Sequence, residues 1–198
     1  MKIKLCGVRT PKDAVLCAEA GADEVGVIFA TTSRRRVTVE EAKAIRGALP
    51  DRLPLVGVFL DADLALVTEV LKHVRLSAVQ LHGHWPKGPC EVPRYAAVQV
   101  ASEAALDRLR GVPEAARILL DGPAGGSGIP FAWSLAKKAR GMHKAQVFIA
   151  GGLTPENVAQ AIREARPDGV DVASGIEGEG GFKDPAKVRA FVAAARTA

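Results

Sequence analysis

Eight short runs rich in β-forming residues recur along this chain, and their spacing limits the folds that it can adopt. Successive runs begin about 18 to 30 residues apart, which suits a strand followed by a helix and is too long for a series of hairpins. The runs begin at Ile3, Glu24, Pro54, Ala78, Ala96, Ala116, Gln146 and Gly169. Eight consecutive strand–helix units predict an α/β chain with a single domain, residues 1–198, closed into a parallel (β/α)8 TIM barrel.

Helical patterns fill most of the gaps between these runs. The predicted helices cover residues 11–22, 39–49, 64–74, 103–111, 131–141, 156–166 and 184–196. Several of them repeat apolar residues at i, i+3, i+4 and i+7, which predicts one buried face. The gap at residues 84–95 instead holds three prolines and no helical pattern. We therefore expect the fourth helix of the barrel to be reduced to a loop or missing.

An open, doubly wound sheet is the main alternative to a closed barrel. Such a sheet typically carries a GxGxxG fingerprint after its first strand, but residues 6–11 read CGVRTP. The sequence contains no Walker motif for nucleotide phosphates either. The closed barrel is therefore the favoured architecture.

The stretch 147–177 reads as a strand, a helix and a second strand. Thr154 is the predicted N-cap of this helix, and Pro155 occupies its first position. The two strands end at Gly151-Gly152 and at Ser174-Gly175, which can expose backbone N–H groups to an anion. TIM barrels usually hold phosphate after the seventh and eighth strands, and these are the seventh and eighth runs. We therefore predict a phosphate site built from both turns.

Composition narrows the classes of function. The formal net charge is +5, but the basic residues are scattered and aromatic residues make up only 5% of the chain, which argues against a nucleic-acid partner. An anionic small molecule accounts for the charge equally well. No apolar run approaches the length of a membrane span, so we expect no membrane partner. Three cysteines without a disulfide or metal spacing are typical of the reducing cytoplasm.

Two residues at predicted strand ends can exchange protons with a substrate inside the barrel. Cys6 ends the first strand and Asp121 ends the sixth, and the chemistry of TIM barrels takes place at these ends. Because the sixth, seventh, eighth and first strands are neighbours in the barrel, the two residues flank the predicted phosphate site. A basic loop, residues 31–36, lies just beyond Cys6.

An ordered set of motifs at these positions is similar to that of one family. The motifs are KLCGV at 4–8, Ser33-x-Arg35, VQLHG at 79–83, LLDG at 119–122, GGSG at 125–128, AGGLTPENV at 150–158 and VDVASG at 170–175. Together they resemble phosphoribosylanthranilate isomerase of tryptophan biosynthesis. The resemblance covers essentially the whole chain, and although each motif alone is weak, the ordered set is specific.

The resemblance implies an aldose–ketose isomerase that needs no metal and no cofactor. In this Amadori rearrangement, N-(5-phosphoribosyl)anthranilate becomes 1-(2-carboxyphenylamino)-1-deoxyribulose 5-phosphate. An acid protonates the furanose oxygen and opens the ring to an iminium, and a base then removes the C2 proton. The family's motifs assign Asp121 as the acid and Cys6 as the base.

The resemblance also implies substrate-binding roles. Arg35 is expected to hold the anthranilate carboxylate through its planar fork of donors, although its neighbours Arg34 and Arg36 remain alternatives. His82 is expected to line the aryl end, and Gln80 is a weaker candidate on the same strand face. Ser127 and Gly128 belong to a glycine-rich segment that could close over the sugar or be a plain surface turn.

Strand alternation places Lys4 on the same inward face as Cys6. Asp171, on the adjacent eighth strand, also faces inward by alternation. We therefore predict an ion pair between Lys4 and Asp171 beneath the thiol. The pair either tunes the reactivity of Cys6 or is a purely structural buried pair.

Other functions remain open at this point. A ribulose-phosphate epimerase would need paired inward aspartates and metal-binding histidines, and an indole-glycerol-phosphate synthase would need more catalytic lysines. A phosphosugar-binding barrel without turnover is a further alternative. A bifunctional sugar isomerase would show two similar half-barrels, and we find no internal repeat. Exposed apolar positions on helices and loops are compatible with a homodimer.

Overall fold

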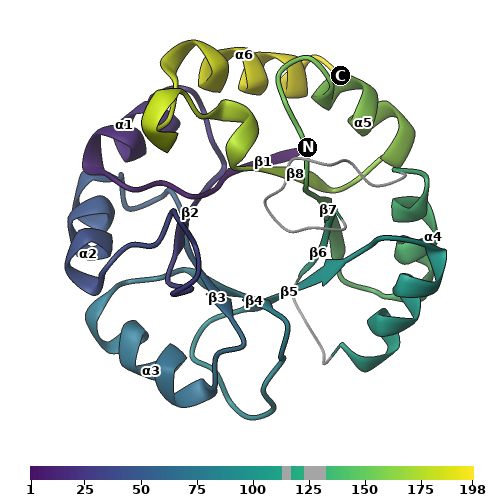
Figure 1. The fold of residues 1–198 in the computed structure, drawn as a ribbon, viewed down its shortest axis with the longest axis horizontal. Helices are drawn as coiled ribbons and strands as arrows, with labels where there is room; N and C mark the ends of the chain where they lie inside the picture. Colours follow the sequence, from purple (N-terminus) through teal and green to yellow (C-terminus); the bar gives the residue numbers. More distant parts are fainter. Residues whose placement is uncertain (113–116, 123–132) are drawn as a thin grey trace.

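The eight strands form a closed barrel. A computed structural model of the protein describes residues 1–112, 117–122 and 133–198. Every strand pairs in parallel with the next, and the last pairs with the first (Figure 1). The strands are β1 (Lys2–Leu5), β2 (Glu24–Ile28), β3 (Leu55–Leu60), β4 (Ala78–His82), β5 (Arg94–Gln99), β6 (Arg117–Asp121), β7 (Gln146–Ile149) and β8 (Gly169–Val172). The predicted parallel barrel is therefore confirmed.

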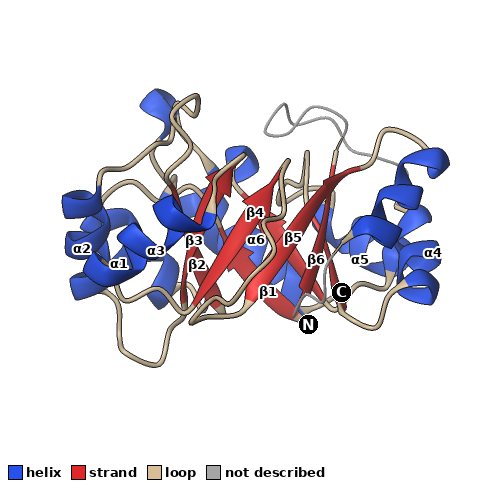
Figure 2. Ribbon diagram, turned by 90° about the horizontal axis from the view of Figure 1, so that it is seen from below, coloured by secondary structure: helices blue, strands red, loops and turns tan. Residues whose placement is uncertain are grey.

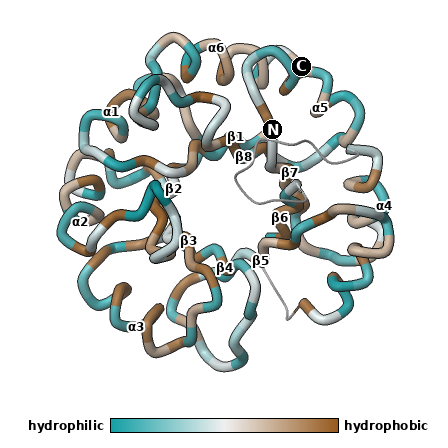
Figure 3. The backbone as a smooth tube through the Cα atoms, viewed as in Figure 1, coloured by the Kyte–Doolittle hydropathy of each residue, from teal (hydrophilic) through white to brown (hydrophobic). Residues whose placement is uncertain are grey.

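Helices surround the barrel in a ring (Figure 1). They are α1 (Pro11–Glu19), α2 (Val39–Ala48), α3 (Leu64–His73), α4 (Leu135–Met142), α5 (Val158–Ala165) and α6 (Pro185–Arg196), with short 3₁₀ helices η1 (Glu103–Gly111), η2 (Ser174–Ile176) and η3 (Glu179–Gly181). Hydrophobic and hydrophilic residues alternate along the helices, as expected where one face packs on the strands (Figure 3). No helix of the described residues is both long and apolar enough to cross a membrane.

The connection between β4 and β5 contains no helix, as its prolines predicted. Arg94 stabilises this loop, because its Nη1 donates to the carbonyl oxygen of Pro86 at 2.8 Å. The next connection differs from the prediction, since residues 103–111 form the 3₁₀ helix η1 rather than an α-helix.

The helix after β7 begins later than predicted. Regular α5 starts at Val158, after a turn, and its N-cap is Asn157 rather than the predicted Thr154. The Thr154 hydroxyl accepts from the N–H of Glu156 at 3.3 Å, and the Asn157 side chain accepts from the N–H of Thr154 at 2.8 Å. The sequence therefore predicted a hydrogen-bonded turn that begins at Thr154, but it placed the start of the regular helix too early.

Buried charged side chains lie inside the barrel, below the C-terminal ends of the strands. At the end where the strands begin, the Arg117 guanidinium stacks over the rings of Tyr95 and Phe148, 4.2 and 3.8 Å from their centroids. Its Nη1 lies 2.5 Å from Glu24 Oε2, and both side chains are almost fully buried. This layer closes the lower end of the barrel with a paired charge rather than an unpaired one.

The two chain ends lie side by side. Arg196 of α6 donates from Nη1 to the carbonyl oxygen of Met1 at 2.9 Å. Both termini lie at the end of the barrel where the strands begin, opposite the loops that follow the strands (Figure 2).

Candidate active site

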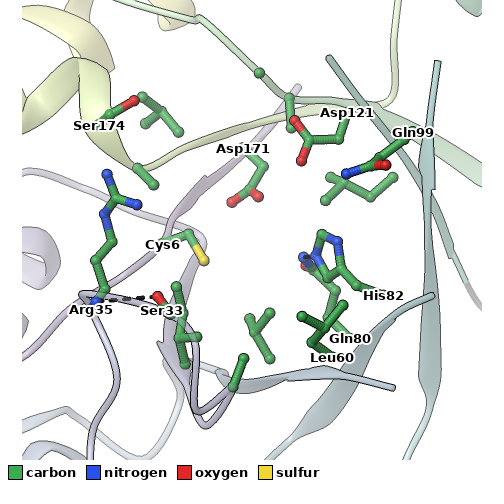
Figure 4. A pocket seen from close by; sticks show the side chains of 18 of the residues that line it. Cys6, Ser33, Arg35, Leu60, Gln80, His82, Gln99, Asp121, Asp171 and Ser174 are labelled. Atoms are coloured by element: carbon green, nitrogen blue, oxygen red, sulfur yellow. Dashed lines mark hydrogen bonds between the residues drawn. The ribbon is translucent and has the colours of Figure 1, made fainter. Parts of the chain in front are cut away.

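A cavity of about 540 Å³ opens at the C-terminal ends of the strands. The side chains of Cys6, Asp121, Asp171 and His82 all point into it, although they come from four different strands or strand ends (Figure 4). The predicted site residues that line the cavity are Cys6, Arg35, His82, Asp121, Gly151, Gly152, Asp171 and Ser174. The barrel therefore brings together residues that are up to 168 positions apart in the sequence, from Cys6 to Ser174.

Asp121 has the properties of a proton donor. Burial raises its pKa to about 6, and the negative charge of Asp171 adds to this effect, while the Gly122 N–H and Lys4 oppose it. The Gly122 N–H donates to Asp121 Oδ1 at 2.8 Å, which leaves Oδ2 free of this bond. A protonated population of the Asp121 carboxyl group is therefore retained near neutral pH.

Cys6 faces the same cavity and is 4% exposed. Burial raises the pKa of its thiol, and the charge of Asp171 adds to this, while Lys4 and Lys183 lower the pKa without cancelling the effect of burial. Most of the thiol is therefore protonated at neutral pH. A base at this position acts through a minor thiolate population, which the nearby lysines favour.

The predicted ion pair beneath the thiol is present. Lys4 Nζ lies 2.9 Å from Asp171 Oδ1, and the two residues are 1% and 6% exposed. Burial lowers the pKa of Lys4, but the charges of Asp171, Cys6 and Glu24 outweigh burial and raise it, so the ammonium group stays charged. Register explains the contact, because Lys4 and Asp171 are directly paired on neighbouring strands.

We predict that Lys4→Met raises the pKa of the Cys6 thiol, because the strongest cation acting on the thiolate is removed. Alkylation rates with iodoacetamide, measured from pH 6 to 10, report this pKa. Lys2→Met is the matched control, since Lys2 lies on the same strand but is exposed. An unchanged alkylation profile in a folded Lys4→Met protein would leave the ion pair with a structural role only.

The two predicted phosphate turns pack against each other. Gly151 and Gly152 have φ values of 78° and 67°, which only glycine adopts without strain. A Cβ on Gly151 would lie 2.4 Å from the Gly122 nitrogen, and one on Gly175 would lie 1.9 Å from the Leu153 carbonyl oxygen. The ends of β6, β7 and β8 are therefore locked together by close backbone contacts. Gly175 itself lies behind Ser174 rather than among the lining residues.

Asp184, at the start of α6, is not among the residues that line the cavity. Its carboxylate instead caps α6 by accepting from the N–H of Lys187 at 2.9 Å. The short helix η2 begins at Ser174, close behind β8, and Ser174 lines the cavity. Its first N–H groups are suited to an anion at the mouth.

Of the three neighbouring arginines, Arg35 is the buried one, at 7% exposure. Arg35 and Arg34 both line the cavity, but the Arg34 side chain is 70% exposed, and Arg36 does not line the cavity. Arg35 also forms a two-pronged ion pair with Glu177, with Nε–Oε1 at 2.5 Å and Nη2–Oε2 at 3.0 Å. Glu177 received no role from the sequence, although it is the second residue after the VDVASG motif.

His82 and Gln80 contact each other, with Gln80 Nε2 2.8 Å from His82 Nε2. Burial lowers the pKa of His82 to about 4, and Lys4 lowers it further, so the imidazole is neutral at pH 7. Apolar side chains for which the sequence predicted no role also line the cavity: Ile28, Val58, Leu60 and Leu119. Strand alternation could have identified Val58 and Leu60, because both share one face of β3.

Two predicted site residues, Ser127 and Gly128, lie outside the described residues, as does the rest of the GGSG segment. Asp61 follows β3 but serves a turn, where it accepts from the N–H of His84 at 3.1 Å. Within residues 1–112, 117–122 and 133–198, no three histidine, cysteine or acidic side chains gather as metal ligands would.

Comparisons with known proteins give consistent results. The profile of the family described as PRAI, N-(5'phosphoribosyl)anthranilate (PRA) isomerase, matches residues 3–194. The chain is 43% identical over 208 residues to N-(5'-phosphoribosyl)anthranilate isomerase of Rubrobacter xylanophilus, with 99% of each chain covered. It is 40% identical over 204 residues to the protein of the same name from Pseudomonas fluorescens, covering 99% of this chain and 98% of that one.

Solved structures show the same similarity. Phosphoribosyl anthranilate isomerase of Thermotoga maritima superposes with a TM-score of 0.87 at 35% identity, with both chains fully covered. A phosphoribosyl anthranilate isomerase in complex with reduced 1-(o-carboxyphenylamino)-1-deoxyribulose 5-phosphate gives 0.86 at 34% identity, again with full coverage. The similarity therefore extends over the whole barrel and includes its mouth.

Proposed function

The chain belongs to the N-(5'-phosphoribosyl)anthranilate isomerase family, and we propose that its barrel mouth catalyses the Amadori rearrangement of N-(5'-phosphoribosyl)anthranilate in tryptophan biosynthesis. One observation carries the proposal: Cys6 and Asp121 face a single cavity from different sides (Figure 4). In the order of the barrel, β7 and β8, which precede the two glycine turns, lie between β6 and β1. A phosphosugar held at those turns would expose its reacting carbons to both groups.

The reaction then needs two proton transfers. The protonated Asp121 carboxyl group donates to the furanose ring oxygen, so the bond from C1 to that oxygen breaks and an iminium forms at C1. The Cys6 thiolate removes the C2 proton, and the electrons of that bond form the C1–C2 double bond and neutralise the iminium nitrogen. Tautomerisation of the resulting enolamine gives the ketone without net oxidation. The raised pKa of Asp121 supports the donor role, because it keeps a protonated population near neutral pH.

Binding groups complete the proposal. Gly151, Gly152 and the turn at Ser174-Gly175 would hold the phosphate, and Arg35 would hold the anthranilate carboxylate. Asp171 and the neutral His82 would line the space between these ends. Ser127 and Gly128 keep their proposed place beside the sugar on sequence resemblance alone.

The direct test uses phosphoribosylanthranilate generated in the cuvette from anthranilate by a coupling enzyme. We expect its fluorescence to disappear on addition of the purified protein, even when a chelator is added once the substrate has formed. Persistent fluorescence with folded protein would reject the activity, and a phosphosugar-binding barrel without turnover would then be the better description.

We predict that Arg35→Ala raises the KM for this substrate by about tenfold or more, because a charge-assisted contact to the carboxylate is lost. Arg36→Ala is the matched control, since Arg36 belongs to the same loop but is exposed and does not line the cavity. Steady-state kinetics on both variants test this. Unchanged KM and kcat in Arg35→Ala would place the carboxylate elsewhere, with Arg34 as the next candidate.

The proposal also covers the cellular compartment and the oligomeric state of the protein. All three cysteines are free, which supports a reducing cytoplasm. A phosphoribosylanthranilate isomerase of Thermotoga maritima is described as dimeric, and this chain exposes Leu66 by 50% and Phe182 by 45%. These side chains support a homodimer of single-domain barrels, each formed by residues 1–198.

A further inference from the structure

Glu177 is a buried carboxylate surrounded by cations. It is 6% exposed and lies 3.1 Å from Arg34 Nη2 and 3.4 Å from Lys183 Nζ, in addition to its two contacts with Arg35. Burial raises its pKa, but the hydrogen bond from Arg35 and the charge of Lys183 outweigh burial, so the pKa lies below its ordinary value. Glu177 therefore stays ionised at neutral pH.

Glu177 contacts Arg35 from the side away from the barrel mouth. It lines a second cavity of about 470 Å³ together with Arg9, whereas it is absent from the residues that line the mouth. Arg35 lines both cavities, as do Arg34 and Ser174, whereas Glu177 lines only the second. The carboxylate is thus placed behind the guanidinium and not beside a substrate in the mouth.

The contacts of Arg35 leave one side of its guanidinium for a ligand. Nε and Nη2 donate to Glu177, and no acceptor within the described residues contacts Nη1. The stem of the side chain is also confined, because a Cβ on Gly7 would lie 2.6 Å from Arg35 Cδ. The arginine therefore has little freedom to turn while Glu177 is in place.

Glu177 is itself held by two lysines. Lys183, whose side chain is fully buried, donates to the carbonyl oxygen of Ala173 at 3.0 Å and approaches Glu177 Oε1. Lys187 donates to the Glu177 carbonyl oxygen at 2.8 Å. The orientation of Arg35 is thus tied to the end of β8 and to α6, the elements that also position the turn at Ser174.

We infer that Glu177 is a positioning residue, which holds the Arg35 guanidinium from behind so that its remaining N–H edge faces the carboxylate of the aryl substrate. The inference rests on the proposed function, in which Arg35 binds that carboxylate. Because the Arg35 guanidinium is already fixed before the substrate binds, binding does not incur the entropic cost of ordering this long side chain. Glu177 thereby contributes to selectivity for an aromatic amine that carries an ortho-carboxylate.

Two ligands that differ only in this carboxylate test the inference. One is reduced 1-(o-carboxyphenylamino)-1-deoxyribulose 5-phosphate, and the other is the same compound without the carboxyl group. We expect Glu177→Gln to raise the Kd of the first by about tenfold or more and that of the second by less than about twofold. Glu179→Gln is the matched control, because Glu179 lies two residues away and is exposed, and both Kd values should stay within about twofold.

Equal weakening of both ligands, or no weakening of either, would overturn the inference, because a general structural role does not discriminate between them. If Glu177→Gln does not fold, Glu177→Asp keeps the charge but withdraws it by one methylene group, and it must show the same selective loss. The proposed function is judged separately, by turnover in the unsubstituted protein. If the unsubstituted protein is active but the Glu177 variants do not discriminate between the two ligands, only the proposed role of Glu177 is rejected.

Discussion

Replacing Asp121 by asparagine is expected to lower kcat by about 10²- to 10⁴-fold, the usual contribution of a positioned general acid. Asparagine preserves the shape of the side chain and can still accept the hydrogen bond from Gly122, but it has no proton to give to the ring oxygen. Fluorescence assays with enough variant enzyme to detect a slow rate measure the loss. Activity within tenfold of the original protein would remove Asp121 from the role of acid.

Stability provides the control for this variant. The pKa of Asp121 is about 6 when folded and near 3.8 when unfolded, so ionisation favours the unfolded chain and stability is lost as pH rises from about 4 to 6. Above pH 6 the free energy of unfolding is lower by on the order of 3 kcal/mol because of this group. Asparagine cannot ionise, so the variant should be at least as stable as the original protein at pH 7. Thermal unfolding at pH 4 and pH 7 checks that the lost activity is not lost structure.

The pH profile of kcat/KM should also depend on the ionisation of the Asp121 carboxyl group. The reaction needs protonated Asp121 and ionised Cys6, although the carboxyl group has the lower pKa. The rate should therefore rise up to about pH 6, because the thiolate population of Cys6 grows. Between about pH 6 and the pKa of the thiol, this growth is cancelled by the loss of protonated Asp121, so the rate stays level. Above the pKa of the thiol the rate should fall. In Asp121→Asn the break near pH 6 should vanish, and the residual rate should keep rising through neutral pH.

Replacing Cys6 by alanine is the second large effect, again about 10²- to 10⁴-fold in kcat, because no other group in the proposed mechanism removes the C2 proton. The variant should bind the product analogue with an affinity close to that of the original protein, since the thiol makes no proposed binding contact. Cys17→Ala is the matched control, because Cys17 is equally buried but does not line the mouth. Near-normal turnover in Cys6→Ala would assign the base elsewhere.

Iodoacetamide supplies an independent measurement of the same role. Alkylation of Cys6 should inactivate the protein, and the product analogue should protect it, because the thiol opens into the cavity that the analogue would occupy. Loss of activity in the Cys17→Ala protein should follow the same time course. Full activity after alkylation of Cys6 would contradict the proposed mechanism.

Local patterns predicted the parts of the site that depend on strand order and alternation. The period of two along β1 placed Lys4 and Cys6 on one face, and the barrel order placed Asp171 beside Lys4, so their ion pair could be anticipated. Glu177 could not be anticipated in this way. Its partner Arg35 is 142 residues away and lies in a loop, where no repeating pattern fixes the direction of a side chain.

Helix boundaries were less predictable for a related reason. Thr154 is a local signal for a helix start, and its hydroxyl does accept from the N–H of Glu156, but regular α5 begins only at Val158 with Asn157 as its N-cap. Residues 103–111 have an amphipathic pattern that fits an α-helix, yet they form the 3₁₀ helix η1. A sequence pattern identifies the buried face, while tertiary packing decides the winding of a short segment.

The contact between Arg196 and Met1 bears on how this enzyme can be engineered. Because the two ends meet on the face of the barrel opposite the mouth, a short linker could join them and new ends could be opened in a surface loop. A tag or a second catalytic unit fused at either end would project from that face. Such additions would leave the entrance for the substrate unobstructed.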